Sequence, residues 1–190
     1  MCRMFAYTGS STSELHALYK ALRESALNDT RGEFYAIFHA RKASRKETVS
    51  TLFSHPFLES SEREIIFLAH NGYVNEGKLR EKLGFNGSSI DSELIAKVIA
   101  KYGTKDEVIG ELKDITVSAL NLLILKIYKE NGKAGLYYIN YYKCSKDYYQ
   151  MYLSTEMKGR AVFSSTLLDY GVEGVPVRGN YLIRLYEGQD

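Results

Sequence analysis

Residues 120–143 read LNLLILKIYKENGKAGLYYINYYK, and this stretch decides the fold class. Two apolar runs within it, Leu120–Tyr128 and Gly135–Lys143, have the length and composition of β-strands. Between them lies Asn131-Gly132, a dipeptide typical of tight turns. The stretch therefore predicts two antiparallel strands joined by a short turn.

Further strands and helices are predicted on either side of this hairpin. The other predicted strands are Cys2–Tyr7, Glu33–His39, Glu64–Ala69, Tyr148–Ser154, Ala161–Ser164 and Tyr181–Tyr186. Apolar residues recur at helical spacing after the capping-box pair Ser11 and Glu14, in Asp91–Lys101 and, more briefly, in Asp106–Leu112. Arg41–Leu58 is predicted to be a long loop, and such loops in compact domains are usually functional. Strands, then helices, then strands again indicate a layered α+β domain.

Length and composition limit the classes of protein to consider. A chain of 190 residues without repeats or linkers predicts a single domain over residues 1–190, large enough for a sizeable core. The net charge of +2 gives no argument for nucleic acid or for an anionic membrane surface. No apolar run has the length of a membrane span, and no export signal is recognised, so we expect a cytoplasmic protein. Cys2 and Cys144 are then expected to be free thiols; the alternative is a disulfide between them.

The second residue of the chain is a candidate nucleophile. Removal of Met1 would leave Cys2 with both a thiol and a free α-amino group. The ordinary pKa of a thiol is about 8.5 and that of an α-amino group about 7.7, so the amine can accept the thiol proton near neutral pH. The alternative is that Met1 is retained and Cys2 is a small buried residue on a first strand.

Four segments of the chain, taken together, form a specific pattern, whereas any one of them would be weak evidence by itself. They are Cys2–Tyr7 (CRMFAY), His39–Ser44 (HARKAS) followed by His55-Pro56-Phe57, Ala69–Val74 (AHNGYV) and Asp91–Leu94 (DSEL). In this order and spacing they resemble the class II glutamine amidotransferase domain, a member of the N-terminal-nucleophile hydrolases. Residues 163–167 and 176–182 resemble the closing strands of small stand-alone members. The resemblance implies a four-layer αββα sandwich of two antiparallel sheets.

The resemblance also implies a role for each matching residue. Cys2 would attack the side-chain amide carbon of glutamine, with its own α-amine as base. The Asn71 side-chain amide and the Gly72 backbone N–H would stabilise the oxyanion of the tetrahedral intermediate. Arg41 would bind the α-carboxylate of glutamine, and Asp91 its α-ammonium group.

Each of these roles has a structural alternative in the sequence itself. Asn71-Gly72 is also a common turn dipeptide, Asp91 is also placed to be the N-cap of a helix, and Arg41 begins a basic run that ordinary solvation explains. His55 and His70 are expected to shape the substrate pocket rather than to act as catalysts. The four histidines lack metal-ligand spacing, so we expect no metal and no other cofactor.

Three functions remain open from the sequence. The first is a glutaminase that passes ammonia to a synthase partner, and the second is a stand-alone amidohydrolase acting on a γ-glutamyl compound. The third is a non-catalytic relative that binds a partner, or a second copy of itself, through the tyrosine-rich segment Tyr137–Tyr152. Aromatic and lysine residues interleave in that segment, which also occurs in single-strand nucleic-acid platforms, but a packed hairpin explains it better at this net charge.

Overall fold

The structure is a computed structural model that describes residues 13, 16, 17, 20, 35–40, 51–156 and 159–187. The chain divides into two compact units, Met1–Tyr35 and Ala36–Asp190. Residues 13, 16, 17 and 20 of the first unit are helical, which agrees with the helix predicted after Ser11. The predicted first strand, Cys2–Tyr7, lies outside the described residues.

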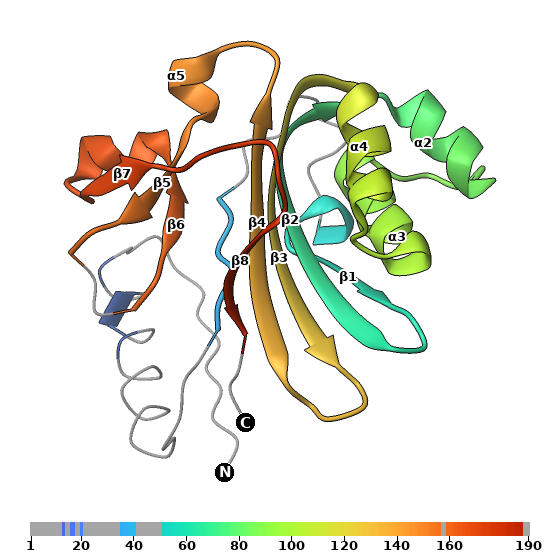
Figure 1. Cartoon of the computed structure of the whole chain (residues 1–190), viewed down its shortest axis with the longest axis horizontal. Helices are drawn as coiled ribbons and strands as arrows, with labels where there is room; N and C mark the ends of the chain where they lie inside the picture. Colours follow the sequence, from blue (N-terminus) through green and yellow to red (C-terminus); the bar gives the residue numbers. More distant parts are fainter. Residues whose placement is uncertain are drawn as a thin grey trace. The chain divides into compact units, whose positions relative to one another are not determined.

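Five antiparallel strands form the larger sheet of the second unit, in the order β1-β2-β3-β4-β8 (Figure 1). They are β1 (Phe57–Ser60), β2 (Glu64–Val74), β3 (Thr116–Tyr128), β4 (Ala134–Tyr142) and β8 (Ile183–Glu187). The predicted hairpin is confirmed as β3 and β4. Its turn contains Gly132 at φ +69°, a conformation that glycine adopts without steric cost, and the Gly132 N–H donates to the Tyr128 carbonyl at 2.8 Å.

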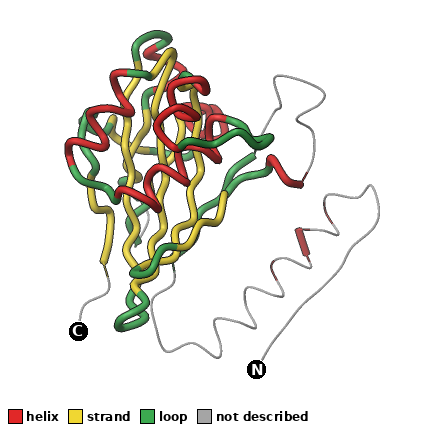
Figure 2. The backbone as a smooth tube through the Cα atoms, turned by 90° about the vertical axis from the view of Figure 1, so that its right-hand side faces the viewer, coloured by secondary structure: helices red, strands yellow, loops and turns green. Residues whose placement is uncertain are grey.

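Three helices pack together on one face of the larger sheet (Figure 1, Figure 2). They are α2 (Glu76–Leu83), α3 (Asp91–Tyr102) and α4 (Asp106–Asp114). The predicted apolar face of α3 is confirmed, since Leu94, Ile95, Val98 and Ile99 are fully buried. Strands β2 and β3 supply the opposing aliphatic side chains of this core, and burying each such side chain contributes about 1.5–3 kcal/mol.

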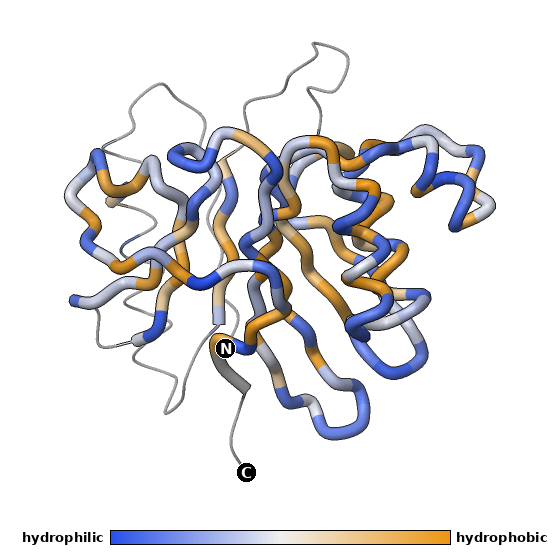
Figure 3. The backbone as a smooth tube through the Cα atoms, turned by 45° about the horizontal axis from the view of Figure 1, so that its top comes forward, coloured by the Kyte–Doolittle hydropathy of each residue, from blue (hydrophilic) through white to orange (hydrophobic). Residues whose placement is uncertain are grey.

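Three short strands form the smaller sheet, in the order β6-β5-β7. They are β5 (Met151–Ser154), β6 (Val162–Ser164) and β7 (Gly174–Pro176), accompanied by the short helical segments α5 (Lys146–Tyr149) and η3 (Ser165–Tyr170). A further short helical segment, η2 (Thr51–Phe53), precedes β1 of the larger sheet. Met151 of β5 packs with Tyr138 and Leu185 of the larger sheet in a second apolar cluster. Hydrophobic residues follow the strands, whereas the tip of the β3–β4 hairpin is hydrophilic (Figure 3).

The two apolar clusters lie on opposite faces of the larger sheet. Leu122 contacts the cluster beneath the helices, whereas its neighbour Leu123 contacts the cluster shared with the smaller sheet. Successive side chains of a strand point to opposite faces, so the helices and the smaller sheet cover different sides. The prediction of an α+β protein with two antiparallel sheets is thereby confirmed.

Several predicted boundaries were wrong. Residues 35–39 of the predicted strand Glu33–His39 are not part of a strand, and the predicted loop ends before Phe57, where β1 begins. The predicted strand Tyr148–Ser154 begins only at Met151, because the N–H groups of Tyr148 and Tyr149 bond to the Ser145 carbonyl and form α5 instead. Helix α2 and strand β7 were not predicted.

Candidate functional site

The sequence-predicted site residues divide into two groups. Cys2 and Arg41 lie outside the described residues. Asn71, Gly72, Asp91, His70 and His55 all lie in the second unit, and the first four of these meet where β2 ends beside the start of α3.

The Asn71-Gly72 dipeptide is part of β2 and does not form a turn. Gly72 pairs with Leu120 of β3, and Val74 pairs with Thr116, so two steps along β2 match four steps along β3. Gly72 has φ +143°, and a Cβ added there would lie 2.0 Å from the Ala119 carbonyl oxygen. The irregular pairing therefore requires glycine at this position, both for its conformation and for the close approach of β3.

The side chain of Asn71 faces the smaller-sheet side. Asn71 lies opposite Asn121, which in turn lies opposite Asn140, so three asparagines form a row across β2, β3 and β4. Asn71 is half-buried, and its side-chain amide has no hydrogen-bond partner among the residues that the structure describes. This amide is thus available to donate to a ligand.

The next two asparagines of the row belong to a closed network of buried amides. Asn140 donates from Nδ2 to Asn121 Oδ1 at 2.8 Å, and both asparagines donate to the Tyr149 carbonyl. The Asn140 Oδ1 atom accepts from Gln150 Nε2 at 3.0 Å and from the Met151 N–H at 3.1 Å. These bonds connect the larger sheet to the chain that enters β5 and fix the sheet face beside Asn71.

His70 lies on the opposite face of β2 and is almost completely buried. Its Nε2 atom is 3.2 Å from the Ala119 carbonyl oxygen, and its Nδ1 atom is 3.0 Å from Ser92 Oγ. Burial lowers the pKa of His70 below the ordinary value of 6.5, and the nearby Asp91 charge and the bond to Ala119 oppose this shift only in part. The imidazole is therefore neutral near neutral pH.

Asp91 is the first residue of α3, directly after the N-cap residue Ile90. The alternative prediction that Asp91 is the N-cap is wrong in this respect. Its Oδ2 atom accepts from the Val74 N–H at 3.0 Å, and its Oδ1 atom accepts from the Ser92 N–H at 2.8 Å. The carboxylate therefore joins α3 to the end of β2, and its side chain keeps 11% of its surface exposed.

No lysine or arginine of the described residues lies within ion-pair distance of Asp91. The nearest ionisable partner is His70, whose Nδ1 atom is 3.8 Å from Asp91 Oδ2. Because that imidazole is neutral near neutral pH, the aspartate is a nearly buried carboxylate without a cationic partner among the described residues. Carboxylates are rarely buried in this way unless a partner or a ligand compensates them.

Ser92 is a site residue that sequence reasoning missed. Its hydroxyl lies between His70 and Asp91 and is buried. The available signal was its position directly after a candidate ligand on the apolar side of α3, where a polar side chain needs a partner.

His55 belongs to a separate aromatic group at the start of β1. Its ring centroid lies 4.1 Å from that of His39 and 4.9 Å from that of Phe57. The His55–Pro56 peptide bond is cis. These contacts place His39 beside the start of the edge strand, and the shaping role of His55 stays a prediction.

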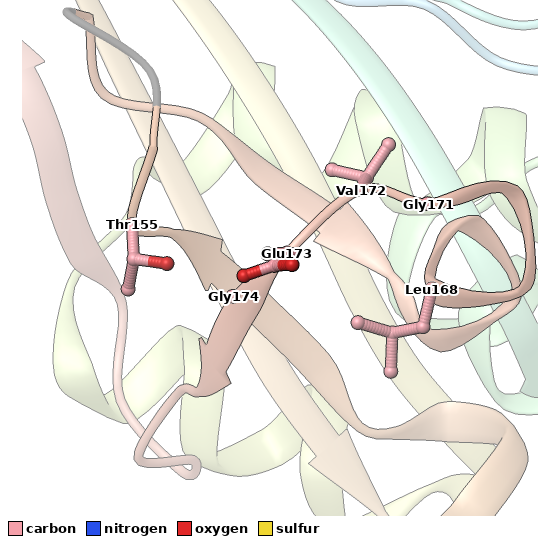
Figure 4. A pocket seen from close by; sticks show the side chains of 6 residues that line it. All are labelled: Thr155, Leu168, Gly171, Val172, Glu173 and Gly174. Atoms are coloured by element: carbon pink, nitrogen blue, oxygen red, sulfur yellow. The ribbon is translucent and has the colours of Figure 1, made fainter.

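A shallow pocket of about 370 Å³ lies beside the smaller sheet (Figure 4). It is lined by Thr155, Leu168, Gly171, Val172, Glu173 and Gly174. Of the sequence-predicted site residues that the structure describes, none lines this pocket, so it is separate from the group formed by His70, Gly72 and Asp91.

The described residues offer neither a metal-binding cluster nor a membrane-spanning helix. They contain no group of three or more His, Cys, Asp or Glu side chains placed to hold a metal ion. Within the same part of the chain, no helix is both long and apolar enough to cross a membrane.

Known proteins do not add to this picture. A scan against protein-family models returned no match, and no curated protein matches the chain. The functional assignment therefore depends on the residues and contacts of the chain itself.

Proposed function

We propose that the chain is a class II glutamine amidotransferase-like amidohydrolase that releases ammonia from glutamine through Cys2. One observation carries the proposal: the nearly buried Asp91 carboxylate lacks a lysine or arginine partner among the described residues and is bonded to the strand that carries Asn71 and Gly72. The α-ammonium group of glutamine is a cation of the right kind to compensate this charge. The same strand carries Asn71 and Gly72, the donors proposed for the scissile amide.

The proposed reaction proceeds in two steps. The Cys2 thiol gives its proton to the α-amine of the same residue, and the sulfur attacks the side-chain amide carbon of glutamine. The C–N bond then breaks, and ammonia leaves with a proton from the α-ammonium group of Cys2. Water attacks the resulting γ-glutamyl thioester, the C–S bond breaks, and glutamate and the free thiol are released.

Asn71 and Gly72 would stabilise the oxyanion in both steps. Support comes from the Asn71 amide, which has no partner within the described part of the chain, and from the close approach of β3 that requires glycine at position 72. Donors that are fixed before the reaction need no reorganisation when charge develops, and loss of one such donor typically costs about 3–4 kcal/mol in the barrier. Arg41 would bind the α-carboxylate, while His55 and His70 would shape the walls of the pocket.

The proposal extends to the fold and to the partner. The two antiparallel sheets and the helices α2, α3 and α4 would belong to a four-layer N-terminal-nucleophile fold. The ammonia would pass to an acceptor on a partner protein. We propose the cytoplasm as the compartment of the chain, because thiols are kept reduced there.

Covalent labelling tests the nucleophile. The protein from its native source is incubated with the glutamine analogue diazo-oxo-norleucine and analysed by intact mass and peptide mapping. We expect loss of Met1 and one adduct on Cys2, with the adduct absent in Cys2→Ala and unchanged in Cys144→Ala, since Cys144 is an exposed free thiol. Retained Met1 without an adduct would refute the proposal and favour a non-catalytic binding protein.

Ammonia release then separates the catalytic alternatives. Glutamine turnover by the purified protein that rises sharply with a co-purifying partner supports the ammonia-transfer role. Full turnover without a partner, or a stronger reaction with another γ-glutamyl compound, supports the stand-alone amidohydrolase.

A further inference from the structure

Ser92 places one hydroxyl between two groups that compete for its hydrogen. Its Oγ atom lies 3.0 Å from His70 Nδ1 and 3.3 Å from Asp91 Oδ1. A serine hydroxyl carries one hydrogen and can donate to only one of these acceptors at a time. All three residues are buried, and the Asp91 side chain keeps some exposed surface, 11%.

The Ala119 carbonyl decides which acceptor receives that hydrogen. A carbonyl oxygen can only accept, so the Nε2 atom of His70, 3.2 Å away, carries the imidazole hydrogen. In the neutral imidazole the Nδ1 atom is then an acceptor, and the Ser92 hydroxyl donates to it at the shorter of its two distances. Among the described residues, Asp91 consequently keeps two backbone N–H donors, Val74 and Ser92.

Protonation of His70 would reverse this arrangement. The Nδ1 atom would become a donor to Ser92 Oγ, and the serine hydrogen would turn to Asp91 Oδ1. The imidazolium would also become a cation 3.8 Å from Asp91. Asp91 is the titratable group that faces His70 from α3, and β3 presents the Ala119 backbone carbonyl to it.

We propose that His70, acting through Ser92, is a positioning residue that keeps Asp91 available for the α-ammonium group of the substrate and so selects glutamine over amides that lack this group. The inference rests on the proposed function. In this arrangement the Ser92 hydroxyl and the substrate ammonium compete to donate to the Asp91 carboxylate. By linkage, the serine hydrogen bond to Asp91 weakens substrate binding by the same factor by which the bound substrate weakens that hydrogen bond.

The test compares hydrolysis of glutamine with that of glutaramate, which is glutamine without its α-amino group. In His70→Gln the new amide nitrogen can still donate to Ala119, but the Nδ1 acceptor is lost, so the serine hydrogen turns to Asp91. We expect KM for glutamine to rise about tenfold and KM for glutaramate to remain unchanged. Adding Ser92→Ala to His70→Gln removes the competing hydroxyl and should restore the preference to within about threefold of the wild type. His16→Gln, at an exposed helical histidine, is the matched control.

A second measurement needs no variant. In the wild-type protein KM for glutamine should rise as the pH falls through the titration of His70, whereas KM for glutaramate should not. Parallel pH profiles for the two amides, or a double variant no better than His70→Gln, would overturn the inference while leaving the proposed function intact. A wild-type protein that hydrolyses neither amide would instead overturn the proposed function and this inference with it.

Discussion

Two buried polar networks lie on opposite faces of the larger sheet, and they differ in whether they are complete. On the smaller-sheet face, Asn121, Asn140 and Gln150 match donors to acceptors with neutral amides. On the helix face, His70, Ser92 and Asp91 include a negative charge and one hydrogen too few for the contacts present.

The comparison distinguishes two roles of buried polar groups, one structural and one in ligand binding. A neutral, satisfied network fixes the position of two sheets and is insensitive to pH. A charged, incomplete network is expensive unless a ligand completes it, which is why such groups concentrate at functional sites. The strand that carries both His70 and Asn71 therefore borders a closed neutral network on one face, beside Asn71, and a charged network on the other, at His70.

Gly72→Ala should have the largest effect, because both networks depend on the strand end that Gly72 shapes. The new Cβ would overlap the Ala119 carbonyl, and the backbone would be strained at φ +143°. We expect a loss of at least about 4 kcal/mol in the free energy of unfolding, measured by urea titration. In Gly110→Ala the Cβ enters open space on α4, so this control should be neutral or stabilising. Equal stability of the two variants would show that the close approach at Gly72 is not structural.

Asn140→Ala should rank second and would test the closed network. The substitution leaves Gln150 Nε2, the Met151 N–H and Asn121 Oδ1 short of a partner, at a cost of about 3 kcal/mol. Because no member of the network titrates, the loss should be the same at acid and neutral pH. The exposed Asn86→Ala is the control, and a pH-dependent loss in Asn140→Ala would contradict the distinction drawn between the two networks.

The pH dependence of stability should identify the charged network. The unfolded chain protonates His70 near pH 6.5, whereas the folded protein does so only at lower pH because burial lowers this pKa. The stabilising contribution of the neutral imidazole is thus fully present above pH 6.5 and is lost as the pH falls below it. Unfolding free energies of the wild type should therefore decline more steeply with acid than those of His70→Gln. Identical slopes would indicate that His70 does not titrate differently on folding.

Tyr73→Ser should have the smallest effect, although Tyr73 directly follows Gly72. Its side chain is 45% exposed and contributes to neither network. We expect a change within about 0.5 kcal/mol in the same urea titration. A larger loss would mean that the strand end is stabilised by its surface as well as by the two buried networks.

The parts of the fold with strong local patterns could be predicted from the sequence. The β3–β4 hairpin and α3 both carry clear apolar periodicity and end signals, and both were found close to their predicted positions. Helix α2 was missed because only Leu79 among its residues is buried, so its apolar pattern is weak. Its caps, Asn75 and Gly84, were the remaining signal, since Asn75 Oδ1 accepts from the Lys78 N–H and Gly84 has φ +63°.

Features of the candidate site that depend on tertiary contacts could not be predicted from local sequence. Asn71-Gly72 has the composition of a turn, yet it continues β2 because β3 pairs with it, and this pairing is a tertiary effect. The family resemblance predicted that His70 and Asp91 belong to one site. It could not show that Ser92 connects them, because a bridge over 22 residues of sequence depends on how α3 packs against β2.

The hydrogen bond from the Val74 N–H to Asp91 has a practical consequence for spectroscopy. A backbone amide that donates to a carboxylate has a proton resonance that responds to the charge and the occupancy of that carboxylate. Val74 itself is fully buried, so its resonance is shielded from direct contact with solvent and additives. In an isotope-labelled sample this single amide signal would act as a built-in gauge of ligand binding at Asp91, readable without turnover.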